Sequence, residues 1–246
     1  MANVVESYQD LVTSRGAMRV HQFSPAGAGA HPAVIFYSEI FQVTAPIRRM
    51  AATLAGEGYL VVVPEVYHEF EALGTVLAYD QAGSDRGNEL KYAKELASYD
   101  EDVEVVVSHL QNDESCTGRI ASFGVCLGGH LAVRAGYHEG IDAVVAFYPT
   151  DLHSATLGAG KSDDTLARIG TIKTPMLFAW GRQDPHIPKE GRAAIHAALE
   201  AAELEFEWHE FNAAHAFLRD EGPRYNPAIA RVCMSLMLRF LSEKLN

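Results

Sequence analysis

The sequence predicts an α/β fold in which a mostly parallel central sheet is covered by helices on both faces. Short, continuously apolar runs recur along the chain at residues 33–37, 59–63, 143–147 and 176–180. Such runs are typical of parallel strands that are buried on both sides. Segments with apolar residues at helical spacing lie between them, and this alternation favours strand–helix–strand crossover units.

The composition is that of a globular protein and argues against several classes of partner. The chain has 246 residues, of which 48% are hydrophobic and 21% charged, so it can bury a sizeable core. A net charge of −12 argues against binding to nucleic acid or to anionic membranes. No apolar run approaches the roughly 18 residues of a membrane span. No repeat or linker divides the chain, and we expect a single domain over residues 1–246.

The cysteines and the N-terminus bear on the cellular compartment. Cys116, Cys126 and Cys233 have no framework spacing, which argues against a disulfide scaffold and fits a reducing compartment. The first ten residues are polar and acidic and lack the regions of a signal peptide. We therefore expect a cytoplasmic protein. Separately, we expect a monomer or small homo-oligomer that acts on a small molecule without a cofactor.

The N-terminal part of the chain predicts the first crossover unit. Residues 17–23 alternate enough to form an edge strand, and residues 33–37 form a buried strand. Thr44 caps a helix whose apolar side chains share one face, and residues 59–63 form the next buried strand.

The middle of the chain departs from this alternation. Residues 65–88 are mixed in character and predict an excursion over the sheet edge. Apolar side chains at helical spacing predict one long helix over residues 90–110, followed by a short strand at residues 120–123. After the buried strand at residues 143–147, a polar insertion spans residues 151–174 with one short helix near Leu166 and Ile169.

The C-terminal part returns to the alternating pattern. It predicts a strand at residues 176–180, a helix at residues 189–202 and a strand at residues 203–211. A last helix begins at Asn226 and Pro227. Its predicted inward-facing residues are Ile229, Val232, Cys233, Leu236, Met237 and Phe240.

The most informative motif is Gly124-Val125-Cys126-Leu127-Gly128, between a predicted strand and a predicted helix. It has the glycine-x-nucleophile-x-glycine arrangement, with cysteine where serine is usual. The glycines let strand and helix approach at a sharp turn, and the helix N-terminus favours a thiolate. The Leu127 N–H would then form half of an oxyanion hole. The alternative is that Cys126 is a buried cysteine that acts as a small hydrophobe.

Two later loops supply an acid and a base. Asp184 follows the strand at residues 176–180, and His215 follows the strand at residues 203–211. The order nucleophile, acid, histidine, each after a strand, is that of the α/β-hydrolase fold, in which these loops open at one edge of the sheet. We expect His215 to take the proton of the Cys126 thiol and Asp184 to fix the histidine tautomer.

Other residues compete for these roles. His130 lies four residues beyond Cys126 and can approach the thiol, or it can pack or cap locally. His186 is too close in sequence to Asp184 to be an easy partner, and Asp184 itself can be a turn residue because Gln-Asp-Pro favours a turn. His209 is expected to point to solvent. No histidines have the spacing of a metal site, so metal binding is not expected.

From about residue 33 to the C-terminus, the chain resembles the dienelactone hydrolase (carboxymethylenebutenolidase) family. The segments that carry this resemblance are residues 38–41, 123–129, 181–184 and 214–219. The resemblance implies a triad of Cys126, Asp184 and His215. It also implies that the Ile40 N–H joins that of Leu127 in the oxyanion hole.

The resemblance also assigns residues around the reaction centre. Glu39 would contact the resting thiol, where a carboxylate disfavours the thiolate, and release it when substrate binds. Arg219 matches an arginine that binds the substrate carboxylate, although a surface salt bridge with its acidic neighbours is the alternative. Arg86 is the match for a second such arginine, with Lys91 the other basic choice. Tyr148 is expected to contact the substrate.

The expected reaction is hydrolysis of an ester or lactone that bears a carboxylate, through an acyl-thioester on the cysteine. Gln42 replaces the glycine that usually follows Glu-Ile-Phe in the family, and the insertion at residues 151–174 replaces a short loop. Two alternatives remain: a cysteine esterase or thioesterase of broader specificity on the same fold, and a non-catalytic binding protein.

Overall fold

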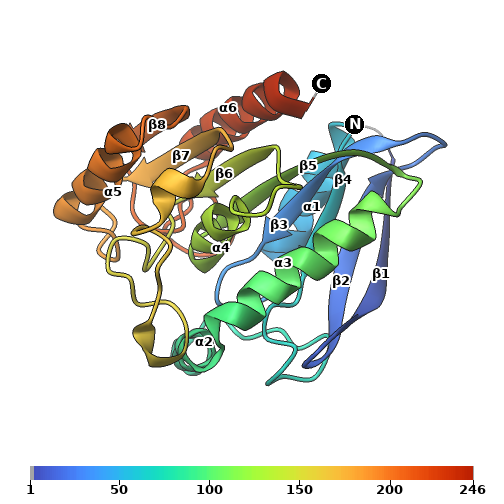
Figure 1. Cartoon of the computed structure of the whole chain (residues 1–246), viewed down its shortest axis with the longest axis horizontal. Helices are drawn as coiled ribbons and strands as arrows, with labels where there is room; N and C mark the ends of the chain where they lie inside the picture. Colours follow the sequence, from blue (N-terminus) through green and yellow to red (C-terminus); the bar gives the residue numbers. More distant parts are fainter. Residues whose placement is uncertain (1–2, 246) are drawn as a thin grey trace.

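The structure, a computed structural model that describes residues 3–245, is built on one eight-stranded sheet (Figure 1). The strand order is β1-β2-β4-β3-β5-β6-β7-β8. Six strands, from β4 to β8 in this order, run parallel, and the β1–β2 hairpin joins them in antiparallel fashion at one edge. Helices α3 and α4 cover one face and α1 and α6 the other, which confirms the predicted fold class (Figure 1).

The strands in the middle of the sheet form the core, and three of them (β4, β6 and β7) are buried at every residue. Their continuous apolar runs lie between the two helical layers, which confirms the strands predicted there. The strands are β1 (Val4–Thr13), β2 (Gly16–Pro25), β3 (His31–Tyr37), β4 (Leu60–Pro64), β5 (Cys116–Val125), β6 (Ala143–Phe147), β7 (Met176–Gly181) and β8 (Phe206–Phe211).

The helices follow the predicted alternation except in the middle of the chain. They are α1 (Ala45–Gly56), α2 (Gln81–Ala93), α3 (Leu96–Gln111), α4 (Leu127–Ala135), α5 (Lys189–Ala201) and α6 (Pro227–Leu245). The single helix predicted over residues 90–110 is wrong, because the backbone is extended at Lys94 and Glu95. At this break the Lys94 ammonium is fully buried and binds Asp102 and Glu69, at 2.7 and 2.9 Å.

Strand β1 was not expected from the sequence, and because of it the predicted edge position of β2 is wrong. β1 pairs along the whole outer side of β2, so residues 17–23 do not form an edge strand. Most side chains of β1 are exposed, which explains why its sequence lacks the apolar alternation of a half-buried strand.

Three other boundaries and faces differ from the expectations. β8 begins at Phe206 rather than at residue 203, because Glu203 has a positive φ of 52° just after α5. Val232 faces solvent with 48% of its surface exposed, so its predicted inward position on α6 is wrong. The insertion at residues 151–174 holds two 3₁₀ turns, η1 (Ala159–Lys161) and η2 (Ile169–Thr171), where one short helix was expected.

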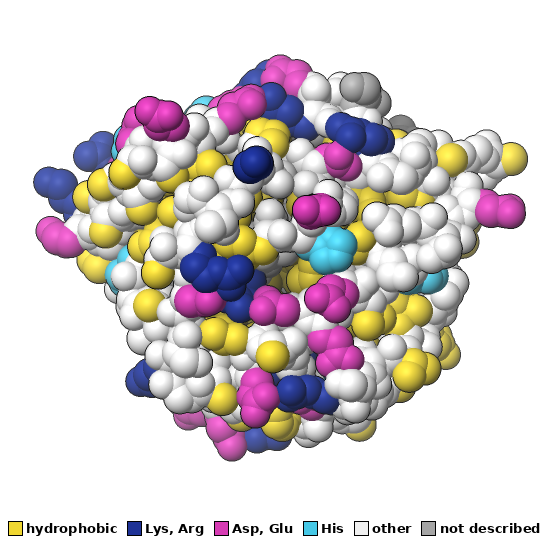
Figure 2. Space-filling model, in the orientation of Figure 1, with side chains coloured by type: hydrophobic (Ala, Val, Ile, Leu, Met, Phe, Trp, Pro, Cys, Tyr) yellow, Lys and Arg dark blue, Asp and Glu magenta, His cyan; other side chains and the backbone are white. Residues whose placement is uncertain are grey.

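Charged side chains of both signs are interspersed on the face of the molecule shown in Figure 2. Among the helices of residues 3–245, none combines the length and the apolarity that a membrane crossing requires. The three cysteines are all free, and Cys233 is buried as expected. A single domain over residues 1–246 stays a prediction, and its outermost residues lie outside the described range.

Candidate active site

The turn from β5 into α4 holds Cys126 in a backbone conformation that is unusual for a residue with a side chain. Its φ is 59° and its ψ is −124°. A Cβ atom on Gly124 would lie 1.9 Å from the Gly128 carbonyl oxygen, and one on Gly128 would lie 2.0 Å from the Tyr37 carbonyl oxygen. No side chain fits at either glycine, which agrees with the reason given for them from the sequence.

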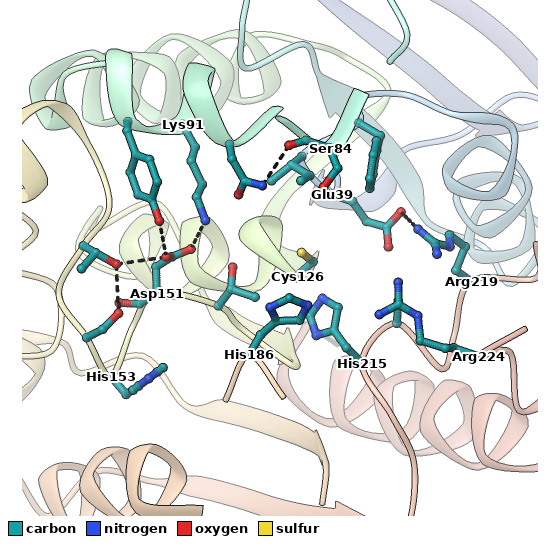
Figure 3. Close-up of a pocket in the computed structure, with 18 residues that line it drawn as sticks. Glu39, Ser84, Lys91, Cys126, Asp151, His153, His186, His215, Arg219 and Arg224 are labelled. Carbon is teal, nitrogen blue, oxygen red and sulfur yellow. Dashed lines mark hydrogen bonds and ion pairs between the residues drawn. The ribbon is translucent and has the colours of Figure 1, made fainter. Parts of the chain in front are cut away.

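Cys126 opens into a cavity of about 420 Å³ at the carboxyl edge of the sheet. The loops after β3, β5, β7 and β8 all contribute to this edge, together with the insertion that follows β6 (Figure 3). The residue is only 8% exposed and lies at the N-terminus of α4, where the helix dipole favours a negatively charged sulfur. This volume is typical of a small-molecule site.

Asp184 and His215 are in direct contact, as expected from their order in the chain. The distance from His215 Nδ1 to Asp184 Oδ2 is 2.6 Å, and the other carboxylate oxygen accepts a hydrogen bond from the His186 N–H at 2.8 Å. The loops after β7 and β8 meet so closely that a Cβ on Gly181 would lie 2.5 Å from the Ala213 carbonyl oxygen. Only glycine fits at this position. The second ring nitrogen of His215 remains available to the thiol.

The surroundings of His215 favour the protonated ring. Burial opposes protonation, but the charge of the Cys126 sulfur and the hydrogen bonds with Asp184 and Cys126 outweigh it and raise the pKa of His215 to about 10. A protonated imidazole beside a thiolate is the resting state of an activated cysteine nucleophile.

Two backbone N–H groups of the site donate no backbone hydrogen bond to any residue in the range 3–245. Leu127 is the first residue of α4, so its N–H has no acceptor one turn earlier. Within the described part of the chain, the Ile40 N–H makes no backbone hydrogen bond either. Helix α2 packs closely against the Ile40 loop and holds it in place. A Cβ on Gly87 of this helix would lie 2.5 Å from the Ile40 carbonyl oxygen.

Glu39 is buried in the cavity wall and is held by a residue that the sequence did not single out. Its Oε2 accepts a hydrogen bond from the Tyr79 hydroxyl at 3.0 Å. The same oxygen lies 3.8 Å from Nη1 of Arg219 (Figure 3). The Tyr79 hydroxyl also contacts the Thr44 hydroxyl at 2.7 Å. The expected contact between Glu39 and Cys126 is not among those of the described residues, since the carboxylate faces Arg219.

Arg219 lies in the cavity wall, with its guanidinium over the Tyr79 ring at 4.2 Å. A surface salt bridge with its neighbours in sequence does not form, because Arg49 of α1 binds the side chains of both Asp220 and Glu221. The backbone of Glu221 accepts a hydrogen bond from Arg219 Nε at 3.2 Å.

The second basic residue of the cavity is Lys91 rather than Arg86. Arg86 does not line the cavity, because its guanidinium pairs with Glu71 and Glu89 at 2.7 and 2.9 Å. Lys91 does line it, but its ammonium lies 2.8 Å from Oδ2 of Asp151. Burial opposes the charge of Lys91, and the Asp151 carboxylate outweighs it and raises the pKa of the lysine.

Tyr148 is not among the residues that line the cavity, so the structure gives no support to its predicted role in substrate binding, which stays a prediction. Its side chain is fully buried and packs edge-on against the rings of His215 and Phe217, with centroid distances of 5.1 and 5.0 Å. It therefore supports the imidazole from behind.

Three further histidines surround the site in different ways. His130 packs locally, one of the two positions expected for it, with Nδ1 3.0 Å from the Thr150 carbonyl oxygen and Nε2 3.2 Å from Asp163. His186 and His153 line the cavity, and burial lowers the pKa of both. No group of three or more His, Cys, Asp or Glu side chains within residues 3–245 is arranged to hold a metal ion.

Gln42 occupies the position where a glycine was expected and keeps the backbone shape that a glycine favours. Its φ is 64°, in the left-handed region. The side-chain amide donates to the Thr75 carbonyl oxygen at 3.1 Å and accepts from the Tyr67 N–H at 3.4 Å, so these bonds offset the strain of the backbone.

Comparison with known proteins gives consistent results. The sequence model of the dienelactone hydrolase family matches residues 18–245. A "putative carboxymethylenebutenolidase" of Saccharomyces cerevisiae is 40% identical over 98% of this chain and 93% of its own length. A carboxymethylenebutenolidase of Pseudomonas putida is 28% identical, covering 89% and 88% of the two chains.

Solved structures agree on the fold. The crystal structure of a "putative dienelactone hydrolase" from Klebsiella pneumoniae superposes with a TM-score of 0.78, with 98% of this chain and 99% of that chain covered. Its sequence identity is 24%, so this likeness concerns the fold alone.

Proposed function

Because the chain belongs to the dienelactone hydrolase family, we propose that it hydrolyses an ester or lactone of a small molecule through a covalent intermediate on Cys126. Family membership establishes a carboxymethylenebutenolidase-like hydrolase. The cysteine nucleophile, the acyl-thioester and the roles of the individual residues are the parts that we propose. The observation that carries them is the contact of Asp184 with His215 beside the sulfur of Cys126.

In the first half of the reaction, the Cys126 thiolate attacks the carbonyl carbon of the substrate. The carbonyl electron pair moves to oxygen, and the N–H groups of Leu127 and Ile40 stabilise the resulting oxyanion. When the tetrahedral intermediate collapses, the C–O bond breaks and the leaving alkoxide takes the proton of the His215 imidazolium. The acyl group is then bound to sulfur as a thioester. With a lactone substrate, the alcohol that leaves is part of the same molecule, so it stays attached to the enzyme through the acyl chain.

In the second half, His215 takes a proton from water, and the hydroxide attacks the thioester carbonyl. The second tetrahedral intermediate collapses with release of the Cys126 thiolate and the carboxylic acid product. Asp184 keeps the imidazole in the correct orientation and stabilises its charge in both halves. Tyr148 holds the opposite side of the ring.

We assign to Glu39 a role in controlling the charge of the thiol. A carboxylate next to Cys126 disfavours the thiolate by repulsion, whereas a carboxylate held by Tyr79 and Arg219 leaves the thiolate free. The contacts of Glu39 with Tyr79 and Arg219 support this role, because they correspond to the second arrangement.

Replacement of the nucleophile tests the proposal. We expect Cys126→Ala to abolish hydrolysis of 4-nitrophenyl esters. Mass spectrometry of the wild-type enzyme after reaction with such an ester should show an acyl adduct at Cys126. Cys116→Ala is the matched control, because Cys116 lies in β5 outside the cavity and is also a free thiol. Full activity of Cys126→Ala, or acylation at another residue, would contradict the proposal.

A cysteine esterase or thioesterase of broader specificity is the second candidate. Asp151, Ser154 and Thr156 of the insertion form a polar part of the cavity wall. They favour this candidate, because the resemblance implies a short loop at this place. A panel of lactones, aryl esters and thioesters distinguishes the two candidates by the ratio of their kcat/KM values. A non-catalytic binding protein would show no turnover and no reaction of Cys126 with iodoacetamide.

A further inference from the structure

The side of the cavity formed by α2 and the insertion at residues 151–174 is polar but carries no net charge. Lys91 and Asp151 line it and pair at 2.8 Å, and both side chains are largely buried. Burial opposes the charge of Asp151, but Lys91 outweighs it and lowers the pKa of the carboxyl, so the carboxylate is ionised at neutral pH. The two charges compensate each other, and the pair offers a substrate neither a free cation nor a free anion.

Three hydroxyl groups that also line the cavity surround Asp151. The hydroxyls of Tyr92 and Thr156 donate to its Oδ1, at 3.2 and 3.0 Å. The Ser154 hydroxyl donates to the Asp151 backbone carbonyl oxygen at 3.1 Å and lies 2.9 Å from the Thr156 hydroxyl oxygen. We call these three residues, together with Lys91 and Asp151, the Asp151 wall.

The direction of these hydrogen bonds determines what the Asp151 wall offers to a substrate. A hydroxyl has one hydrogen to donate and lone pairs that accept, whereas an ionised carboxylate only accepts. Tyr92 and Thr156 therefore both direct their single hydrogen to Asp151. The hydrogen of Ser154 is taken up within the wall as well, by oxygens of Asp151 and Thr156. The three hydroxyls thus have no hydrogen left to donate, and within the described part of the chain each oxygen keeps a lone pair that can accept.

A surface of acceptors selects a substrate group that donates a hydrogen bond. A carboxylate has only acceptor oxygens, so it would meet the lone pairs of the three hydroxyls and the charge of Asp151. An alkyl group would displace water and leave the hydroxyl oxygens without a partner, which costs free energy. A substrate hydroxyl donates to one of these oxygens. Its own oxygen accepts from Lys91, which has three N–H donors and directs one of them to Asp151.

The proposed reaction directs the acyl part of the substrate to the Asp151 wall. The leaving oxygen lies next to His215, which protonates it, so the acyl chain extends away from the imidazole. Figure 3 shows Asp151 and His215 on different sides of the Cys126 sulfur. An acyl chain bound to this sulfur therefore extends along the wall.

We propose that the hydroxyls of Tyr92, Ser154 and Thr156 bind a hydroxyl group on the acyl part of the substrate, so that the enzyme prefers hydroxylated acyl groups over plain alkyl ones. The inference rests on the hydrolysis proposed above and adds the chemical class of the acyl group. Two of the three residues belong to the insertion, so this segment supplies most of the preference.

The test compares 4-nitrophenyl 6-hydroxyhexanoate with 4-nitrophenyl heptanoate, which has a terminal methyl group in place of the hydroxyl. We expect the wild-type enzyme to have the higher kcat/KM for the hydroxy ester. Ser154→Ala removes one acceptor without touching the Asp151 carboxylate, and it should lower the hydroxy-to-alkyl ratio about threefold, mainly through the KM for the hydroxy ester. Adding Thr156→Val should lower the ratio about tenfold in all. Thermal unfolding of each variant checks that the fold is intact.

Ser162→Ala is the matched control. Ser162 lies in the same insertion and also donates to a backbone carbonyl oxygen three residues earlier, that of Ala159, but it does not line the cavity. We expect its replacement to leave the ratio unchanged.

A third ester, 4-nitrophenyl 6-methoxyhexanoate, separates donation from acceptance, because its ether oxygen only accepts. Equal kcat/KM values for the methoxy and hydroxy esters would overturn the inference. So would a wild-type enzyme without preference for the hydroxy ester, or an equal fall for the hydroxy and alkyl esters in Ser154→Ala. Absence of an acyl adduct on Cys126 with all three esters would instead overturn the proposed function.

Discussion

At the scale of the residue, the pKa of His215 links the two halves of the proposed reaction. In the free enzyme the Cys126 sulfur and Asp184 outweigh burial and hold this pKa at about 10. Acylation removes the charge of the sulfur, so burial is then opposed by Asp184 alone and the pKa falls. His215 is therefore an acid before acylation and a base after it.

We predict that acylation by an alkyl ester slows as the pH rises through about 10, because the leaving alkoxide needs the proton of His215. Mass spectrometry of the acyl-enzyme in rapid-quench experiments measures this rate. A 4-nitrophenyl ester is the control, since its leaving group needs no proton and its rate should fall less. If acylation by the alkyl ester already slowed near neutral pH, a pKa of about 10 for His215 would be contradicted.

Single residues also explain which parts of the site were predictable. Cys126, Asp184 and His215 are recognisable because each follows a predicted strand, and the fold places strand ends together. Tyr79 gave no such signal, because it lies in an irregular segment whose path the sequence does not define. Arg86 was wrongly placed because spacing along α2 does not show that Glu71 and Glu89 capture its guanidinium.

At the scale of the element, the Lys91–Asp151 pair joins α2 to the insertion after β6. Asp151 has a positive φ of 64°, and its second oxygen accepts from the hydroxyls of Tyr92 and Thr156, at 3.2 and 3.0 Å. The pair is nearly buried, so loss of one partner leaves an uncompensated charge on the other.

We predict that Asp151→Ala lowers the free energy of unfolding by about 3 kcal/mol, because it leaves the Lys91 ammonium buried and unpaired. Urea-induced unfolding measures the change. The control is Arg86→Ala on the same helix, which breaks two ion pairs that are partly exposed to solvent and should cost less than about 1 kcal/mol. Similar losses in the two variants would show that burial does not strengthen the Lys91–Asp151 pair.

Elements were predicted well where burial determined their pattern. β4, β6 and β7 have continuous apolar runs because helices cover both of their faces. The break between α2 and α3 was missed because the helical spacing continues across it, while the buried ion pairs of Lys94 depend on residues far away in the chain. β1 was missed because its solvent-exposed side chains carry no period.

At the scale of the whole molecule, buried carboxylates make stability depend on pH. Burial opposes the ionisation of Asp151 and Asp163, but Lys91 and His130 outweigh it and lower the pKa of each carboxyl below its ordinary value of about 3.8. A lowered folded pKa contributes stability that is present above the unfolded pKa and is lost as the pH falls through the folded one.

We predict that the contribution of these carboxyls to the free energy of unfolding is constant near neutral pH and falls as the pH drops below about 4. Urea titrations at a series of pH values measure this dependence. Asp151→Asn cannot ionise at this position, so its curve should be shallower on the acid side. A curve as steep as that of the wild type would mean that Asp151 does not contribute to the acid sensitivity.

The contacts of His130 would limit the transfer of the insertion at residues 151–174 into a related protein. This histidine, on the helix that begins after Cys126, contacts the Thr150 carbonyl oxygen, just before the insertion at residues 151–174, and Asp163, in the middle of that insertion. The Thr150 N–H also donates to the Cys126 carbonyl oxygen at 3.2 Å. A transplanted segment would therefore keep its orientation in a new host only if the host also supplied a histidine at this helical position.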